Sequence, residues 1–364
     1  MQSLDFIDKW QIICTKIEDF SLKIRIFAIH KLTMMRFRTL LLPLLAVCVI
    51  SACKKSETEK TYMDGAFKLV HHMPQFVKVG AQYSFSVSGI EAPDGTDVGY
   101  CFTHPTTKKI DTTAHYTFVV PDTLGTFAVV CTAYPVQSSD LYYTSSTSVS
   151  FTVVDDEKSL SKMLLSPDAG TAVLHSRKYD TMPGGGSEWI CANLSYIQRN
   201  AAGEETFGHS YKDSPAMQNI LGAYYTWEEA QEACPEGWRL PSDQDWVNLI
   251  KSCGGPDTLL PLEDSPSGAG NLMTRLTFNG NNMWEYFRGV KITGSAFMGI
   301  IPAGYATISG DKYNFTGYGS YAAFWTSDEL DGNGVYRYLY QEYDTVYSGL
   351  ADKQSFAASV RCVR

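Results

Sequence analysis

The residues of this chain best suited to chemistry are its nine cysteines. No two of them form the Cys-x-x-Cys spacing of zinc and redox sites. The chain also lacks Gly-x-Ser-x-Gly, His-Glu-x-x-His and phosphate-loop motifs. Among its histidines only His71 and His72 are neighbours, which is ordinary for polar surface. We therefore expect no enzyme, no catalytic residues, no cofactor and no metal ion.

One cysteine, Cys53, stands in a context that predicts lipid attachment. Residues 34–52 combine a basic start, an apolar run over 40–50 and small residues before the cysteine. The run is too short to span a bilayer and is typical of a secretory signal peptide. Its Ile-Ser-Ala-Cys end resembles a bacterial lipobox, in which the thiol is diacylated and becomes the mature N-terminus. The alternative is an ordinary signal peptide with a chance cysteine.

This leader implies where the protein resides. The lipid on Cys53 would make the membrane a partner, and the two lysines that follow favour an outer-membrane lipoprotein, at the cell surface or on the periplasmic face. Residues 1–33 precede a complete signal. We interpret them as an extension from a start codon placed too early, with Met34 or Met35 as the true start.

Charge and composition narrow the functional class. The formal net charge is −9, and residues 1–52 contain seven of the 30 Lys and Arg but only four of the 39 Asp and Glu. The remainder of the chain therefore carries a formal net charge of −12. We do not expect so acidic a protein to bind nucleic acid. With 22 Tyr and 29 Gly, the composition favours a β-rich extracytoplasmic protein.

The chain divides into two predicted domains behind a tether at 53–65. Over 66–155, short alternating apolar runs are separated by turn signals, which predicts a small antiparallel β-sandwich. Residues 121–130 resemble the late strand pair of immunoglobulin-like or PKD-like modules. Cys101 and Cys131 lie on two of its strands and either form a disulfide or remain two buried thiols. A polar linker is expected over 156–180, followed by a flexible Gly-rich loop at 181–186.

Two consecutive helices are predicted in the second domain. Thr226 and Glu229 form a capping box before the first helix, which stops at a Pro-Glu-Gly turn. Ser242 caps the second helix, whose apolar residues recur at helical spacing until Gly254. These helices would position the motifs around them, and short strands are expected around 297–301, 322–326, 335–340 and 355–363.

A series of motifs identifies this second domain, 181–364. The longest is Cys-Pro-Glu-Gly-Trp-Arg-Leu-Pro-Ser-Asp from Cys234, and further motifs lie at 188–194, 225–227, 301–305, 324–329 and 359–363. Together they resemble the Fibrobacter succinogenes major paralogous domain. The resemblance implies a C-type-lectin-like fold, two helices beside a twisted antiparallel sheet, often found on lipoproteins. The expected fold class is thus mainly β, an immunoglobulin-like sandwich followed by an α+β C-type-lectin-like domain.

The same resemblance implies a disulfide between Cys234 and Cys362. Such a bridge would close most of the domain into one loop and stabilise it by about 4–5 kcal/mol in the chain-entropy model. Cys191 and Cys253 either form a second bridge or remain two buried thiols.

Two functional alternatives fit the motifs less well. The Gly-Trp-Arg-Leu-Pro-Ser stretch also resembles formylglycine-generating enzymes, whose chemistry needs two neighbouring thiols near the C-terminus, where Cys362 stands alone. A less favoured calcium site comprises Asp328, Asp331 and Asn333, whose Asp-Gly and Asn-Gly pairs are mainly hairpin signals.

The favoured site is a Gly-rich, Tyr-rich segment of the second domain. Its candidate ligand-binding residues are Tyr305, Tyr313, Tyr318 and Tyr321. Tyrosines on loops offer amphipathic contact area at low entropic cost, although some would only pack the segment down. We expect a lipid-anchored, non-catalytic cell-envelope protein that binds a glycan or a protein; the alternative is a structural or adhesin subunit of a surface appendage.

Overall fold

The computed structural model describes residues 59–364, apart from residue 138. The expected extension 1–33, the signal peptide 34–52, Cys53 and the first part of the tether lie outside these described residues. Residues 60–364 form one compact unit. No helix in this described part is long and apolar enough to cross a membrane.

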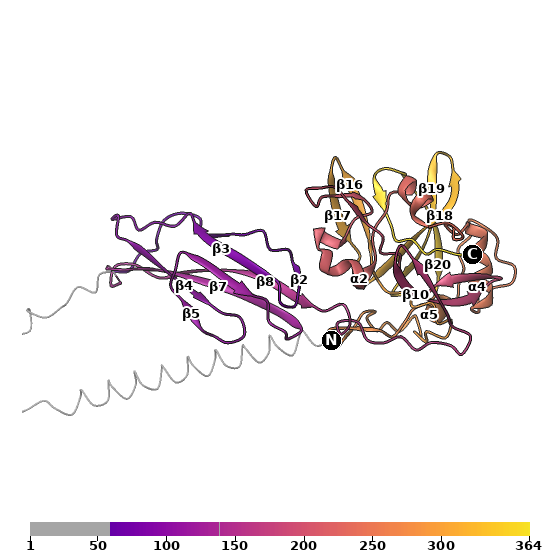
Figure 1. Ribbon diagram of the computed structural model, residues 1–364, viewed down its shortest axis with the longest axis horizontal. Coiled ribbons are helices and arrows are strands. Elements are labelled where there is room, and N and C mark those ends of the chain that lie inside the picture. Colours follow the sequence, from indigo (N-terminus) through magenta and orange to yellow (C-terminus); the bar gives the residue numbers. More distant parts are fainter. Residues whose placement is uncertain (1–58, 138) are drawn as a thin grey trace, which may run out of the picture. The chain divides into compact units, whose positions relative to one another are not determined.

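Two β-sheets form the N-terminal module (Figure 1). The smaller sheet contains β1 (Lys68–Val70), β3 (Gln82–Ser88) and β6 (His115–Val119), with β3 in the middle. The larger sheet runs in the order β2 (Phe76–Lys78), β8 (Ser145–Val154), β7 (Gly125–Pro135), β4 (Val98–Thr103) and β5 (Ile110–Asp111). Alternate residues of both sheets, such as Phe85 and Phe151, share one buried core. The period-two pattern of the sequence thus produces the expected two-layer module.

Cys101 and Cys131 of this module are free thiols, so the disulfide considered between them does not form. On the paired strands β4 and β7, Cys101 lies opposite Thr132 and Cys131 lies opposite Phe102. This offset of one residue directs the two side chains to opposite faces of the sheet. Cys131 is therefore buried in the core while Cys101 is only half-buried.

The predicted linker 156–180 is wrong in its second half. β9 (Gly170–Leu174) and the start of β10 (Arg177–Gly184) lie within it and pair antiparallel. β10 then pairs with β11 (Ser187–Ile190) through a turn at Gly185. A Cβ on Gly185 would lie 2.5 Å from the backbone nitrogen of Leu249. The glycine therefore lets the turn pack closely against the helix that contains Leu249.

Both predicted helices are present, as α3 (Trp227–Ala233) and α4 (Asp243–Ser252). Each begins with a capping box, Thr226 with Glu229 and Ser242 with Asp245. The domain also contains four one-turn helical segments that were not predicted: η1 (Tyr211–Asp213), η2 (Pro215–Met217), α2 (Gln218–Leu221) and α5 (Ala269–Leu272).

Two three-stranded sheets and two hairpins complete the C-terminal domain. The first sheet consists of β18 (Tyr321–Leu330), β19 (Asn333–Tyr340) and β20 (Val346–Ala351), and the second of β17 (Lys312–Thr316), β16 (Tyr305–Ser309) and β21 (Phe356–Ala357). The hairpins are β12 (Gln198–Arg199) with β13 (Glu205–Phe207), and β14 (Thr277–Phe278) with β15 (Asn281–Asn282). The chain as described is therefore β-rich with few helices, as expected.

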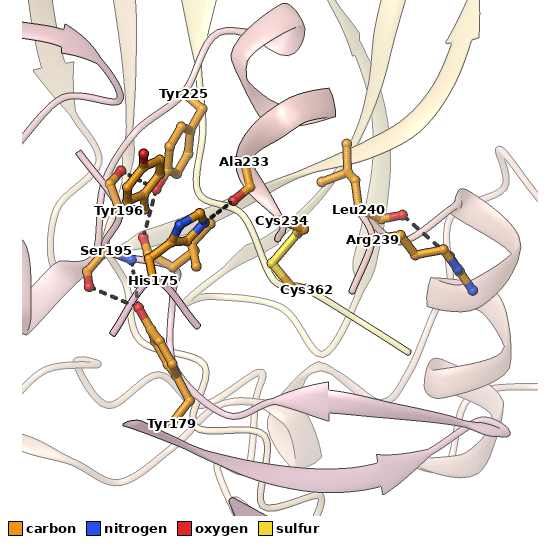
Figure 2. The surroundings of a disulfide bond; sticks show 11 residues. His175, Tyr179, Ser195, Tyr196, Tyr225, Ala233, Cys234, Arg239, Leu240 and Cys362 are labelled. Carbon is orange, nitrogen blue, oxygen red and sulfur yellow. Dashed lines mark hydrogen bonds between the residues drawn. A yellow bond between two sulfur atoms is a disulfide. The ribbon is translucent and has the colours of Figure 1, made fainter. Parts of the chain in front are cut away.

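A disulfide joins Cys234 to Cys362, as the family resemblance implied, with a Cα–Cα distance of 5.8 Å (Figure 2). Cys234 caps the C-terminal end of α3, and Cys362 lies two residues before the last residue, Arg364. The bridge therefore joins the end of α3 to the C-terminal segment, across a sequence separation of 128 residues.

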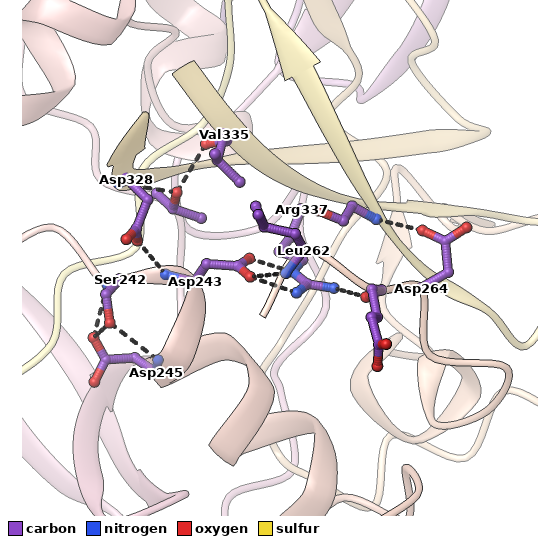
Figure 3. Close-up of polar contacts among 11 residues, drawn as sticks. Ser242, Asp243, Asp245, Leu262, Asp264, Asp328, Val335 and Arg337 are labelled. Carbon is purple, nitrogen blue, oxygen red and sulfur yellow. Dashed lines mark hydrogen bonds and ion pairs between the residues drawn. The ribbon is translucent and has the colours of Figure 1, made fainter. Parts of the chain in front are cut away.

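A buried ion pair ties the second helix to the sheet (Figure 3). Arg337 of β19 is fully buried and donates from Nε and Nη2 to the carboxylate of Asp243, at 2.5 and 2.7 Å. Its Nη1 donates to the Glu263 carbonyl at 2.6 Å. Asp243 also accepts from the backbone nitrogen of Leu262, at 2.7 Å. The pair thus fixes α4, β19 and the intervening loop together.

Candidate functional site

The four candidate tyrosines are all half-buried, and they do not gather into one site. Tyr318 packs into an aromatic cluster, with ring centroids 5.4 Å from Tyr211 and 6.5 Å from Phe76. Burial raises the pKa of Tyr318 to about 12. The Tyr318 ring therefore mainly packs the protein interior, which is the alternative role that the sequence indicated for some of the four tyrosines.

Tyr313 belongs to a separate polar cluster on β17. Its ring stacks on His209 at a centroid distance of 3.8 Å. The His209 nitrogens lie 3.9 Å from carboxylate oxygens of Glu205 and Glu229. Burial lowers the pKa of His209, although the two carboxylates oppose this effect. Because Glu229 caps α3 and Glu205 accepts from the hydroxyl of Ser210, the cluster mainly holds neighbouring elements together.

Tyr305 and Tyr321 do lie together, at the border of a larger aromatic surface. Their rings meet edge to face at 5.2 Å. Tyr321 also stacks on Tyr338 of the neighbouring strand β19, at 5.0 Å. Tyr338 in turn stacks on Tyr347 of β20, at 4.7 Å. The contacts thus run across the whole β18–β19–β20 sheet.

We call this surface the tyrosine face. It consists of half-buried tyrosines that share one side of the sheet: Tyr321, Tyr336, Tyr338, Tyr340 and Tyr347. Tyr321 pairs with Tyr340, and Tyr338 pairs with Tyr347, so the rings form cross-strand neighbours. The alternate residues, including Phe324 and Leu339, point to the opposite side and are fully buried in the core.

Small residues beside the tyrosines leave space for their rings. A Cβ placed on Gly349 would lie 2.7 Å from a ring carbon of Tyr336, and Ala323 stands opposite Tyr338. Burial raises the pKa of both Tyr336 and Tyr338. Their hydroxyls are therefore neutral at physiological pH and can both donate and accept hydrogen bonds. The face combines flat apolar rings with neutral polar tips, which suits non-covalent recognition.

Sequence reasoning found one member of this face, Tyr321, and missed the other four. The signal was present in the strand predicted over 335–340, where Tyr336, Tyr338 and Tyr340 alternate with buried residues. Alternation shows that the three tyrosines share a side, but which side remains half-exposed depends on where α4 packs.

The less favoured calcium residues have other roles. Asp331 and Gly332 form the two-residue turn between β18 and β19, both with positive φ, as their Asp-Gly pair predicts. An Asp328 carboxylate oxygen accepts from the backbone nitrogen of Asp243 at 2.6 Å (Figure 3). Asn333 donates to the Asp331 carbonyl within the turn. Within residues 59–364, residue 138 aside, no group of three or more His, Cys, Asp or Glu is placed to hold a metal ion.

The two free thiols of the C-terminal domain lack the features of nucleophiles. Cys191 is buried, and burial raises its pKa to about 12. Burial also raises the pKa of Cys253, which packs against the same core. At neutral pH both remain protonated, whereas covalent chemistry requires the thiolate. Cys362, the cysteine nearest the C-terminus, is held in the disulfide.

The C-terminal domain thus combines several small β-sheets and two capped helices with one disulfide. Residues 184–364 match the model of the family described as the Fibrobacter succinogenes major domain. The C-terminal domain of this chain belongs to that family, as the motifs of the sequence indicated. No curated protein matches the chain.

Proposed function

We propose that this chain is a lipid-anchored protein of the cell envelope that binds a glycan or a protein ligand non-catalytically. The lipid would be attached at Cys53, and the ligand would bind the tyrosine face of the C-terminal domain. The observation that carries the binding role is the continuous row of stacked tyrosines, whose rings stay half-exposed while alternating residues such as Phe324 and Leu339 are fully buried.

The physical chemistry of the face supports this role. Stacked rings are already ordered before a ligand arrives, so binding costs little side-chain entropy. Their flat apolar faces can contact the C–H faces of sugars or the side chains of a protein. Neutral hydroxyl tips add hydrogen bonds without the desolvation cost of charges. An aromatic surface of this kind is typical of binding surfaces.

An enzymatic role receives less support from the same observations. The disulfide between Cys234 and Cys362 occupies the thiol that formylglycine-generating chemistry would need. The remaining thiols of the domain, Cys191 and Cys253, have raised pKa values because they are buried. We therefore propose binding rather than catalysis.

The test is to screen the full chain, extracted in detergent, against glycan and envelope-protein arrays. We expect selective binding to one class of ligand. The double variant Tyr338→Ala and Tyr347→Ala should weaken that binding about tenfold or more, because it removes the central stacked pair. A matched control is Tyr286→Ala, since Tyr286 is 88% exposed and lies outside the tyrosine face.

The outcomes separate the alternatives. Equal loss in the control would mean that the face has no special role, and unchanged binding in the double variant would place the ligand elsewhere. No binding on either array would favour the structural or adhesin role in a surface appendage. Near-ultraviolet circular dichroism of each variant checks that its fold is retained.

A further inference from the structure

A second candidate site lies where the N-terminal module meets the C-terminal domain. A cavity of about 670 Å³ is lined by strands of the first module, by the hairpin of β14 and β15, and by residues 318–320 and Gln341. This volume is within the range of sites for small ligands. The cavity is distinct from the tyrosine face, whose five residues are absent from its lining.

The cavity adjoins a built contact between the two modules. The Phe76 ring of β2 packs edge to face against Tyr211 at 5.7 Å and against Phe278 at 6.5 Å. The Ser214 hydroxyl donates to the Phe76 carbonyl at 2.6 Å, and both groups are buried. Residues on either side of the cavity are therefore held in place by apolar packing and a buried hydrogen bond.

Two residues of the lining carry buried oxygen atoms without a hydrogen-bond partner. They are Oδ1 of Asn279 and Oε1 of Gln341. Asn279 is fixed by the Asn-Gly turn of its hairpin, with φ of 48°, and its Nδ2 donates to the Val153 carbonyl at 2.9 Å. Gln341 is only 7% exposed. An unpartnered buried acceptor destabilises the fold, and each of these oxygens would gain a partner if its side chain turned toward a donor bound in the cavity.

The rest of the lining defines the chemistry of that ligand. Amide and hydroxyl side chains dominate, among them Asn281, Asn282 and Ser320, while Phe278 and Tyr318 supply aromatic rings. None of the lining residues is Lys, Arg or His, which disfavours an anion. A purely apolar ligand would leave the amides unpaired. We propose that the cavity binds a short neutral saccharide, whose hydroxyls donate to Asn279 and Gln341 when these amides turn toward it and whose C–H faces contact the rings.

The experiment titrates a panel of neutral oligosaccharides, made of glucose, mannose, xylose or N-acetylglucosamine units, into the full chain in detergent. Binding is measured by calorimetry and by saturation-transfer NMR. We expect at least one member to bind. Gln341→Met should weaken its affinity about tenfold because one hydrogen bond to the ligand is lost. The same variant should keep or raise the melting temperature, since it also removes an unpartnered oxygen.

A second variant and two controls make the test specific. Thr126→Trp, at an exposed position of β7 that lines the cavity, should block binding by filling the space. Gln354→Met changes an exposed glutamine outside the lining and should have no effect. The double variant of the tyrosine face, Tyr338→Ala with Tyr347→Ala, should also leave this affinity unchanged.

Two results would overturn the proposal. One is the absence of binding across the whole panel. The other is binding that survives both Gln341→Met and Thr126→Trp. If affinity is instead lost only in the double variant of the tyrosine face, saccharide binding belongs to that surface. The proposal for the cavity then fails while the proposed function stands.

Discussion

Two arginines of the C-terminal domain are buried to about 1% exposure or less, and their partners differ in kind. Arg337 faces a carboxylate, that of Asp243, whereas Arg361 donates only to neutral oxygens. The acceptors of Arg361 are the Asn193 side chain and the carbonyls of Ile190, Met298 and Gly299. Burial lowers the pKa of Arg361 to about 10. The Arg361 side chain therefore remains charged at neutral pH, and each of the two arginines holds separate segments together.

The buried pair predicts a large effect of a single substitution. Arg337→Met should lower the free energy of unfolding by about 3–5 kcal/mol, because it leaves the Asp243 carboxylate buried without its counter-charge. Denaturant unfolding measures this loss. Arg239→Met is the matched control: the Arg239 side chain is 53% exposed in its pair with Asp245, so it should cost about 1 kcal/mol or less.

The double variant Arg337→Met with Asp243→Leu checks the explanation. Removing both charges should recover part of the stability, since the cost arises from an unpaired buried ion rather than from lost volume. Similar small losses for Arg337→Met and for Arg239→Met would contradict the role assigned to the pair.

At the scale of elements, the sequence predicts those features that depend on residues close together in the chain. The capping box at Thr226 and the N-cap at Ser242 predict the two helices correctly, because both signals depend on residues only a few positions apart. The short strands expected around 322–326 and 335–340 lie within β18 and β19. By contrast, the Gly-rich stretch over 181–186 was interpreted as a flexible loop. It belongs to a hairpin because its turn packs against α4, a contact invisible in the local sequence.

The candidate site shows the same limit. The sequence predicts tyrosines as the binding residues; Tyr321 belongs to the tyrosine face, and Tyr305 borders it. Tyr313 and Tyr318 were placed with them because all four are close in sequence. In the structure β17 carries Tyr313 to His209, and the loop after it carries Tyr318 to Phe76, so they leave the face. Which tyrosines come together depends on how distant strands pair, and a single sequence does not reveal that pairing.

The disulfide links an element to the chain end and predicts an effect on stability. Replacing Cys234 and Cys362 by Ala should lower the free energy of unfolding by about 4–5 kcal/mol in the chain-entropy model, because the unfolded chain is no longer closed into a long loop and regains conformational entropy. Denaturant unfolding with and without a reductant measures the effect. Cys101→Ala is a matched control, since Cys101 is a free, half-buried thiol. A reductant that destabilises the double variant as much as the original chain would contradict this origin.

At the scale of the whole molecule, the acidic charge outside residues 1–52 and the β-rich fold suit an extracytoplasmic protein held at a membrane by lipid. Each buried methylene of a fatty chain contributes about 0.8 kcal/mol to membrane binding, and one chain alone binds only reversibly. Two acyl chains on one cysteine would therefore anchor the binding domain stably without a membrane-spanning segment. The tether then sets how far the ligand sites reach from the bilayer.

Lipid attachment predicts the behaviour of a single cysteine variant. In a bacterial host, radiolabelled palmitate should enter the chain, and Cys53→Ser should abolish the labelling and the detergent-dependent extraction from membranes, because the acylated thiol is gone. Cys48→Ser, five residues upstream, is the matched control and should be labelled normally. Mass spectrometry of the extracted protein should find an N-terminal lipidated Cys53 and no Trp10. Label that persists in Cys53→Ser, or a mature chain that retains Trp10, would show that the membrane is reached in another way.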